Sequence, residues 1–231
     1  MKFCQAFDRE LAGAVKVLTP QSSELTEKSV AKSMMARVKR WRMGAAKPVF
    51  SRIAVAMPTE AEVVLNFIDP VKGSLTRSEW PEVWADLEAE LVMKLEGPGG
   101  PFGMDGVENG IFFEIPVHRK SGRTGPGGPG VEAGWLILEL DETFLREVYF
   151  PELVETFLEP SAKGFYQVTI FDGHDEPVFS TGNEGDPVSM VEVPFHFRGR
   201  EAKGSGGVPG GPIWKLDVRR KNGELERMVA S

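Results

Sequence analysis

The chain has few of the residues that build disulfides, metal sites or membrane spans. Its 231 residues include one cysteine, Cys4, so neither an intrachain disulfide nor a cysteine metal cluster can form. No apolar run reaches the roughly 18 residues that a membrane helix needs, and the first residues lack the apolar stretch of a signal peptide. The chain as given is therefore expected to be soluble. If the protein works outside the cytoplasm, its targeting segment is expected to have been removed.

Groups that support catalysis or metal binding are also sparse. The three histidines, His118, His174 and His196, have no partner at metal-ligand spacing. His118 ends a predicted strand beside Arg119, which suits either a pocket position or, more commonly, an exposed strand end. There is no Gly-x-Ser-x-Gly elbow, and Cys4 has no candidate base near it in sequence. We predict no catalytic residue, no metal ligand and no cofactor, and the sequence leaves any ligand-binding residue unknown.

Acidic residues outnumber basic ones by 34 to 27, which gives a net charge of −7 and argues against nucleic acid as a partner. The segment from Lys28 to Thr59 is the exception, because it holds eight basic residues and no acid. It is either a phosphate-binding or nucleic-acid surface or, as the overall acidity favours, the solvated face of a helix whose Trp41 faces the core. Acids gather between Glu60 and Glu96, so we expect the basic helix to lie against an acidic neighbour.

Three segments rich in glycine and proline interrupt the pattern, at 97–106, 121–130 and 204–212. Within the second, Gly125–Gly130 formally matches a dinucleotide-binding fingerprint. That fingerprint works only between a strand and a helix, where the helix N-terminus meets the pyrophosphate. Here a polar segment precedes it and a predicted strand follows, so we interpret it as a flexible loop.

Apolar periodicity predicts two helices before the first strand. Steps of three and four residues give one stripe over 3–18. Thr19-Pro20 then predicts a break before a second helix over about 23–43. The residues of the first stripe are expected to form either a core face or a dimer seam. They include Phe3, Phe7, Leu11 and Val15.

The rest of the chain predicts short strands and two more helices. We expect Ser78 to cap one helix, and Asp141 to cap another that runs to about Leu158 and bends at Pro151. Strand 134–140 is nearly all apolar and is expected to be buried on both faces. The other expected strands are 51–57, 62–68, 111–117, 166–171, 177–179, 191–197 and 213–220. Short connections favour antiparallel pairing, so the predicted class is α+β.

Two further features concern surfaces. Pro194 should place strand 191–197 at the edge of its sheet, because proline cannot donate to a ladder. Four tryptophans occupy apolar-face positions, where they either line a small-molecule pocket or, more commonly, form core. These are Trp80, Trp84, Trp135 and Trp214.

Several segments together resemble the extracytoplasmic sensor domains of bacterial sensor histidine kinases, which are PAS-like or Cache-like. The run from Gly134 to Leu145, followed by Pro151-Glu152-Leu153-Val154, resembles a strand, a Leu-Asp pair and a Pro-Glu-Leu-Val helix of that family. Other segments match its hairpins, a helix start and the approach to a second membrane helix. They are 52–56, 69–73, 79–81, 165–172, 176–180, 214–219 and 223–226. Together these segments cover well over half of the chain.

The resemblance implies long N-terminal helices packed on mostly antiparallel PAS-like or Cache-like sheets. The implied units are signalling helices over 1–50, a membrane-distal unit over 51–140, a second unit over 141–223 and the start of a membrane-entering helix over 224–231. The two middle units are alternatively one continuous domain. The implied role is a non-catalytic, periplasmic input domain of a homodimeric kinase, responding to a small-molecule or protein signal. Both ends of the chain would connect to membrane helices.

Two other functions stay open on the residues alone. One is a protein-binding module that captures its partner by adding a strand to the edge at 191–197. The other is a hydrolase that uses His118 or His174 with a nearby carboxylate. The second predicts a pocket in which a histidine is hydrogen-bonded to an acid.

Overall fold

The computed structural model describes residues 2–26, 28–44, 47–60, 62–69, 72, 74–96, 112–118, 132–158, 166–172, 176–182, 193–195 and 214–220. Its helices are α1 (Lys2–Leu18), α2 (Val30–Gly44), α3 (Ala85–Glu96), α4 (Glu142–Phe144) and α5 (Phe150–Phe157). Its strands are β1 (Phe50–Pro58), β2 (Val63–Ile68), β3 (Leu75–Ser78), β4 (Phe112–His118), β5 (Glu132–Leu140), β6 (Tyr166–Phe171), β7 (Pro177–Ser180), β8 (Val193–Phe195) and β9 (Trp214–Arg220). The predicted α+β class, with N-terminal helices packed on antiparallel sheets, is confirmed.

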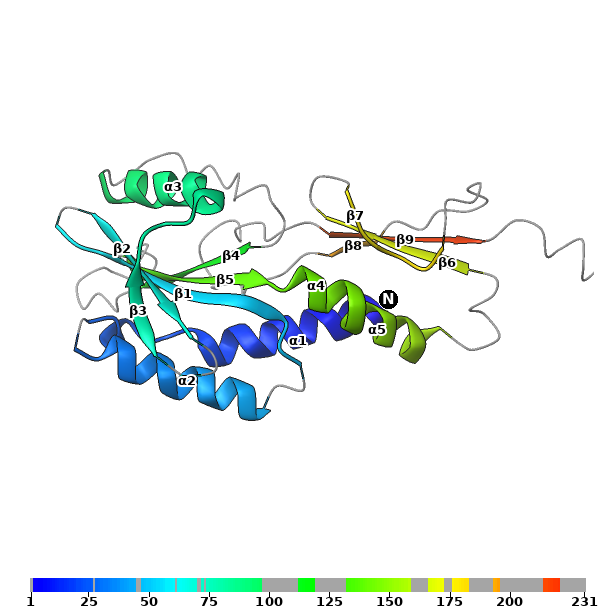
Figure 1. The fold of residues 1–231 in the computed structure, drawn as a ribbon, viewed down its shortest axis with the longest axis horizontal. Helices are drawn as coiled ribbons and strands as arrows, with labels where there is room; N and C mark the ends of the chain where they lie inside the picture. Colours follow the sequence, from blue (N-terminus) through cyan, green and yellow to red (C-terminus); the bar gives the residue numbers. More distant parts are fainter. Residues whose placement is uncertain are drawn as a thin grey trace, which may run out of the picture.

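The first sheet has the order β3-β2-β1-β5-β4, and every neighbouring pair is antiparallel. Its central strand β1 alternates between two apolar layers, as the period of a strand requires. Ile53 and Val55 belong to the cluster that includes α1 and α2, whereas Ala54 and Ala56 belong to the cluster under α3. The sheet is therefore covered by α1 and α2 on one face and by α3 on the other (Figure 1).

The second sheet has the order β7-β6-β9-β8 and is also antiparallel. Pro194 lies in β8, which among the described strands pairs with β9 alone, so the predicted edge position is confirmed. One apolar cluster includes residues of the first sheet, α1, α5 and the second sheet. Helix α1 runs beneath the first sheet, and its N-terminal end lies beside α5 (Figure 1).

Strand β5 is buried from Ala133 to Leu138, which confirms the prediction of burial on both faces. The predicted cap at Asp141 is also confirmed, because its carboxylate accepts a hydrogen bond of 2.9 Å from the backbone N–H of Phe144. Within the described residues, no helix is both long and apolar enough to cross a membrane.

Two predictions of local structure were wrong, and one strand was not predicted. Ser78 ends strand β3 instead of capping a helix. Helix α3 follows the 3-10 turn Glu82–Trp84, which begins after Pro81. The second helix begins at Val30 and not near residue 23, because the 3-10 turn Ser22–Glu24 forms its own capping box with Gln21. The short polar strand β3 was not predicted, because its residues lie outside both apolar clusters apart from Leu75, which is partly buried.

Candidate functional site

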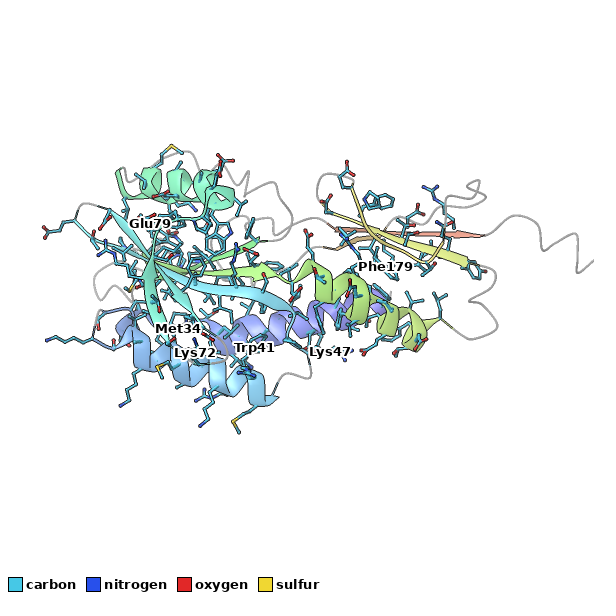
Figure 2. The ribbon with its side chains drawn as sticks, in the orientation of Figure 1. Met34, Trp41, Lys47, Lys72, Glu79 and Phe179 are labelled. Atoms are coloured by element: carbon cyan, nitrogen blue, oxygen red, sulfur yellow. The ribbon has the colours of Figure 1, made fainter. Side chains whose placement is uncertain are left out.

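An aromatic cluster joins the N-terminal helix, α5 and the second sheet. We call it the aromatic junction, and it consists of Phe3, Phe7, Tyr149, Phe150 and Phe179. Phe150 lies at its centre, with ring centroids 5.7 Å from Phe7, 5.8 Å from Phe179 and 6.5 Å from Phe3. The tilted and edge-on arrangements are those that aromatic pairs favour. Phe179 is labelled on the side of the second sheet that faces the helices (Figure 2).

The stripe of α1 is therefore core. Phe3, Phe7 and Leu11 are all buried within the chain, and Val15 packs partly buried against the same cluster. Of the two alternatives for this stripe, the core face is confirmed. A second molecule would have to meet α1 on its other face, where Gln5, Arg9, Ala12, Gly13 and Lys16 are exposed.

The helix that carries Tyr149 and Phe150 contains a π turn over Leu145–Tyr149. The backbone N–H of Phe150 donates to the carbonyl of Leu145, five residues earlier. Pro151 follows directly and has no N–H to give to the carbonyl four residues before it. The predicted bend at Pro151 thus takes the form of a π turn that ends just before the proline. Such turns occur frequently at functional sites.

Polar contacts hold the outer side of the junction. Lys47, which follows α2, forms an ion pair with Glu152 of α5. Its ammonium also lies 5.0 Å from the centroid of the Tyr149 ring, within the range of a cation–π contact. Burial, assisted by the charge of Glu10, raises the pKa of Tyr149 well above its ordinary value. The phenol therefore stays neutral at physiological pH and serves as a packing group.

A second candidate site is an ionic cluster between α3 and edge strand β4, which we call the carboxylate cluster: Glu90, Lys94, Glu114 and Glu132. The Lys94 ammonium donates to both oxygens of Glu114, at 2.8 and 2.9 Å, and lies 2.8 Å from Glu90. Glu132 accepts a hydrogen bond of 2.7 Å from the indole N–H of Trp135. Two carboxylates thus share the Lys94 ammonium in a partly buried setting, and the charge of Glu132 acts on Glu114 beside them.

Burial sets the proton affinity of this cluster. It raises the pKa of Glu114, the charges of Glu90 and Glu132 raise it further, and Lys94 only partly offsets the increase. Burial alone would lower the pKa of Lys94, but Glu114 and Glu90 outweigh it, so the net shift of Lys94 is upward. Lys94 therefore remains charged at neutral pH. The folded state therefore binds a proton at Glu114 more readily than an unfolded chain would.

Replacing Lys94 with methionine is expected to destabilise the fold at neutral pH, because it leaves Glu114 partly buried without its cation. The expected loss is roughly 1 to 3 kcal/mol, the usual cost of leaving a buried polar group without its partner. Protonation of Glu114 removes the uncompensated charge, so the loss should shrink between about pH 7 and about pH 4. Urea denaturation at both pH values measures this, with Lys39→Met on the exposed face of α2 as the control. A loss that does not change with pH would contradict the assignment.

One buried acid was missed in the sequence. Asp217 of β9 is 2% exposed, and its Oδ2 accepts a hydrogen bond of 2.6 Å from Nε of Arg219. Its Oδ1 has no hydrogen-bond partner in the described part of the chain. Opposite Asp217 in the sheet lies Thr169 of β6. The alternation of β9 places Asp217 on a predictable face, but no sequence signal shows that this face is covered.

Those of the other predicted site residues that the structure describes do not assemble into a catalytic centre. His118 is exposed at the end of β4, opposite Glu132 in the ladder, and no hydrogen bond joins it to a carboxylate among the described residues. No group of acids, histidines or cysteines in that same set could hold a metal ion. His174, His196 and Gly125–Gly130 lie outside the described residues, as does the side chain of Cys4.

The tryptophans that the structure describes are core residues. Trp84 and Trp135 are each 1% exposed, and Trp80 packs partly buried beside them. The indole N–H of Trp84 donates to Glu139 at 3.1 Å, and that of Trp80 donates to the carbonyl of Val63 at 3.2 Å. The side chain of Trp214 lies outside the described residues.

The helix of the basic segment is amphipathic and turns Trp41 to the core, as predicted. Val30, Met34, Val38 and Trp41 are the buried residues of α2, and Met34 and Trp41 lie on its inner side (Figure 2). The expected pairing with acids from 60 to 96 is not what the ion pairs of this segment show. Arg37 pairs with Glu24 at 2.7 Å and Arg52 with Glu139 at 3.1 Å. These acids come from other parts of the chain, because α2 packs on the opposite face of the sheet from α3.

Comparison with known proteins gives no relative. No protein-family model matches the chain, and no curated protein is significantly similar to it. What the chain does must therefore be inferred from its own residues.

Proposed function

We propose that this chain is the extracytoplasmic sensory domain of a homodimeric sensor histidine kinase. In this proposal the domain carries no catalysis of its own. A small-molecule or protein signal alters its packing, and α1 passes the change to a membrane helix. The observation that supports this best is the aromatic junction, because α1 packs there against both a π turn and the second sheet.

The junction suits signal transfer for a physical reason. Close-packed aromatic rings cannot deform continuously, so a change in the second sheet or the π turn must shift their partners. Phe3 and Phe7 lie on the first two turns of α1, so a shift of Phe150 reaches that helix directly. Helix displacements of roughly 1–2 Å are typical of such switches.

The carboxylate cluster is the best candidate for the sensing side of this domain. Its three acids and one ammonium leave an excess of negative charge where solvent is partly excluded. The indole of Trp135 links it to the apolar layer under α3. A ligand with a cationic group, or a change of pH, would alter the packing of α3 on β4.

A protein-binding module remains the second candidate, because β8 has a partner strand on one side only among the described strands. An edge strand can capture an extended peptide through backbone hydrogen bonds. The two candidate functions differ in which backbone amides a bound partner would protect from hydrogen exchange. Strand addition would slow amide exchange in β8, whereas a sensory ligand at the carboxylate cluster would slow it in α3 and β4.

Cysteine crosslinking of the full-length gene product in its membrane tests the proposed homodimer. In a Cys4→Ser background, Ala12→Cys places one thiol on the exposed face of α1, and we expect oxidation to give a crosslinked dimer. Met93→Cys, exposed on α3, is the matched control and should crosslink much less. A full-length product without membrane helices, or equal crosslinking at both positions, would count against the proposal.

A further inference from the structure

Two exposed surfaces of opposite charge lie on opposite sides of the first sheet. The basic face belongs to α2 and the turn before it, and the acidic face belongs to α3 and the segment before it. The basic face comprises Lys28, Lys32, Lys39 and Arg40, with Met35 and Met43 exposed among them. The acidic face comprises Glu79, Glu82 and Asp86, with Val83 and Met93 exposed beside them. Helices α2 and α3 stand on the two sides of the sheet in Figure 1.

Among the residues that the structure describes, the charges of both faces have no ion-pair partner. Within the described residues, Lys32, Lys39 and Arg40 form no ion pair, and neither do Glu79, Glu82 and Asp86. Arg37, a half-buried basic residue of α2, is by contrast paired with Glu24. Each face also exposes large apolar side chains, with Met43 79% and Val83 61% exposed. Both faces thus combine free charge with apolar surface, as interaction surfaces commonly do.

We propose that the basic face of one molecule docks against the acidic face of a second copy of this chain. The two faces complement each other in charge, and complementary charge steers association and fixes which surfaces meet. A two-fold dimer through α2 would instead bring like charges together. Because the two faces lie on opposite sides of the sheet, the contact is head-to-tail and repeats from one copy to the next.

Nucleic acid or an anionic membrane would use the basic face alone. A second copy satisfies both faces at once, which is why it is the occupant that the structure favours. The contact is made of exposed charges, so it should be weak and sensitive to salt. This inference rests on the two faces alone and does not depend on a sensory role.

The osmotic second virial coefficient, measured by static light scattering on the whole chain, tests this contact. A molecule with a net charge of −7 and no complementary faces becomes more repulsive as salt is lowered, because screening is lost. With complementary faces the coefficient should instead move towards attraction at low salt. Increasing repulsion at low salt in the native chain would overturn the proposal.

Two variants with unchanged net charge sharpen the test. The exchanged variant carries Lys32→Glu, Lys39→Glu and Arg40→Glu on one face and Glu79→Lys, Glu82→Lys and Asp86→Lys on the other. The two faces then exchange the sign of their charge. Attraction between molecules should persist. The mixed variant carries only Lys32→Glu, Arg40→Glu, Glu79→Lys and Glu82→Lys. Each face then holds charges of both signs, so attraction between molecules should be lost. Equal coefficients for the native chain and the mixed variant would overturn the proposal. So would native-chain binding to anionic vesicles in preference to self-association, because the basic face would then have a lipid occupant.

Discussion

Replacing Phe150 with alanine is expected to cost about 3 to 5 kcal/mol of unfolding free energy, the range measured for buried phenylalanines. Phe150 is 1% exposed and touches rings from α1, the π turn and β7. The aromatic rings that contact Phe150 are rigid, so they cannot readily fill the space that its side chain leaves. Urea denaturation followed by circular dichroism measures the loss.

Phe157 provides the matched control, since it lies on the same helix and is 38% exposed. Phe157→Ala should change the unfolding free energy by less than about 1 kcal/mol, as surface substitutions generally do. Similar losses at the two positions would show that the aromatic junction is not the packed centre described above.

Gly134→Ala is the second substitution with a large expected effect. Gly134 lies inside β5 with a φ of 153°, where side chains other than glycine are strained. An added Cβ would lie 2.7 Å from the backbone oxygen of Ala56 and 3.0 Å from Cδ1 of Leu25. Backbone strain and overpacking each cost about 1 to 3 kcal/mol, so the expected loss is roughly 2 to 6 kcal/mol. Thermal or urea unfolding measures it.

Gly13→Ala should have the opposite sign. Gly13 lies on the exposed face of α1, and an added Cβ would meet no atom within 4 Å. Alanine favours a helix over glycine by about 0.5–1 kcal/mol, so this variant should be slightly more stable than the native chain. A Gly13→Ala variant that is less stable than the native chain would contradict the open surface described around α1. A Gly134→Ala variant with unchanged unfolding free energy would contradict the close packing described around β5.

The sequence predicted those parts of the fold in which apolar spacing decides the structure. The stripe of Phe3, Phe7 and Leu11, the doubly buried β5 and the cap at Asp141 each follow from a local pattern that tertiary packing reinforces. The predicted helix cap at Ser78 was wrong, because a serine before an apolar run can end a strand as well as cap a helix. At this position the pairing of β3 with β2 decided the outcome.

The candidate sites were harder to predict, because they bring together residues distant in sequence. Lys94 meets Glu114 across 20 positions, and Phe3 meets Phe150 although all the strands of the first sheet lie between them in sequence. The π turn also has no simple sequence signature, although Pro151 marks where it ends. The basic segment was predicted from its composition, but the ion pairs of Arg37 with Glu24 and of Arg52 with Glu139 depend on which acids the fold brings beside these residues.

The most direct test of the sensory proposal is autophosphorylation of the full-length gene product in membranes, assayed as phosphohistidine formed from labelled ATP. The native protein should incorporate phosphate. Phe7→Leu, which alters the aromatic junction but keeps an apolar side chain, should change the rate without loss of protein from the membrane. Phe157→Leu should leave the rate unchanged. Absence of phosphohistidine in the native protein, or a rate that is the same in Phe7→Leu as in the native protein, would contradict the account.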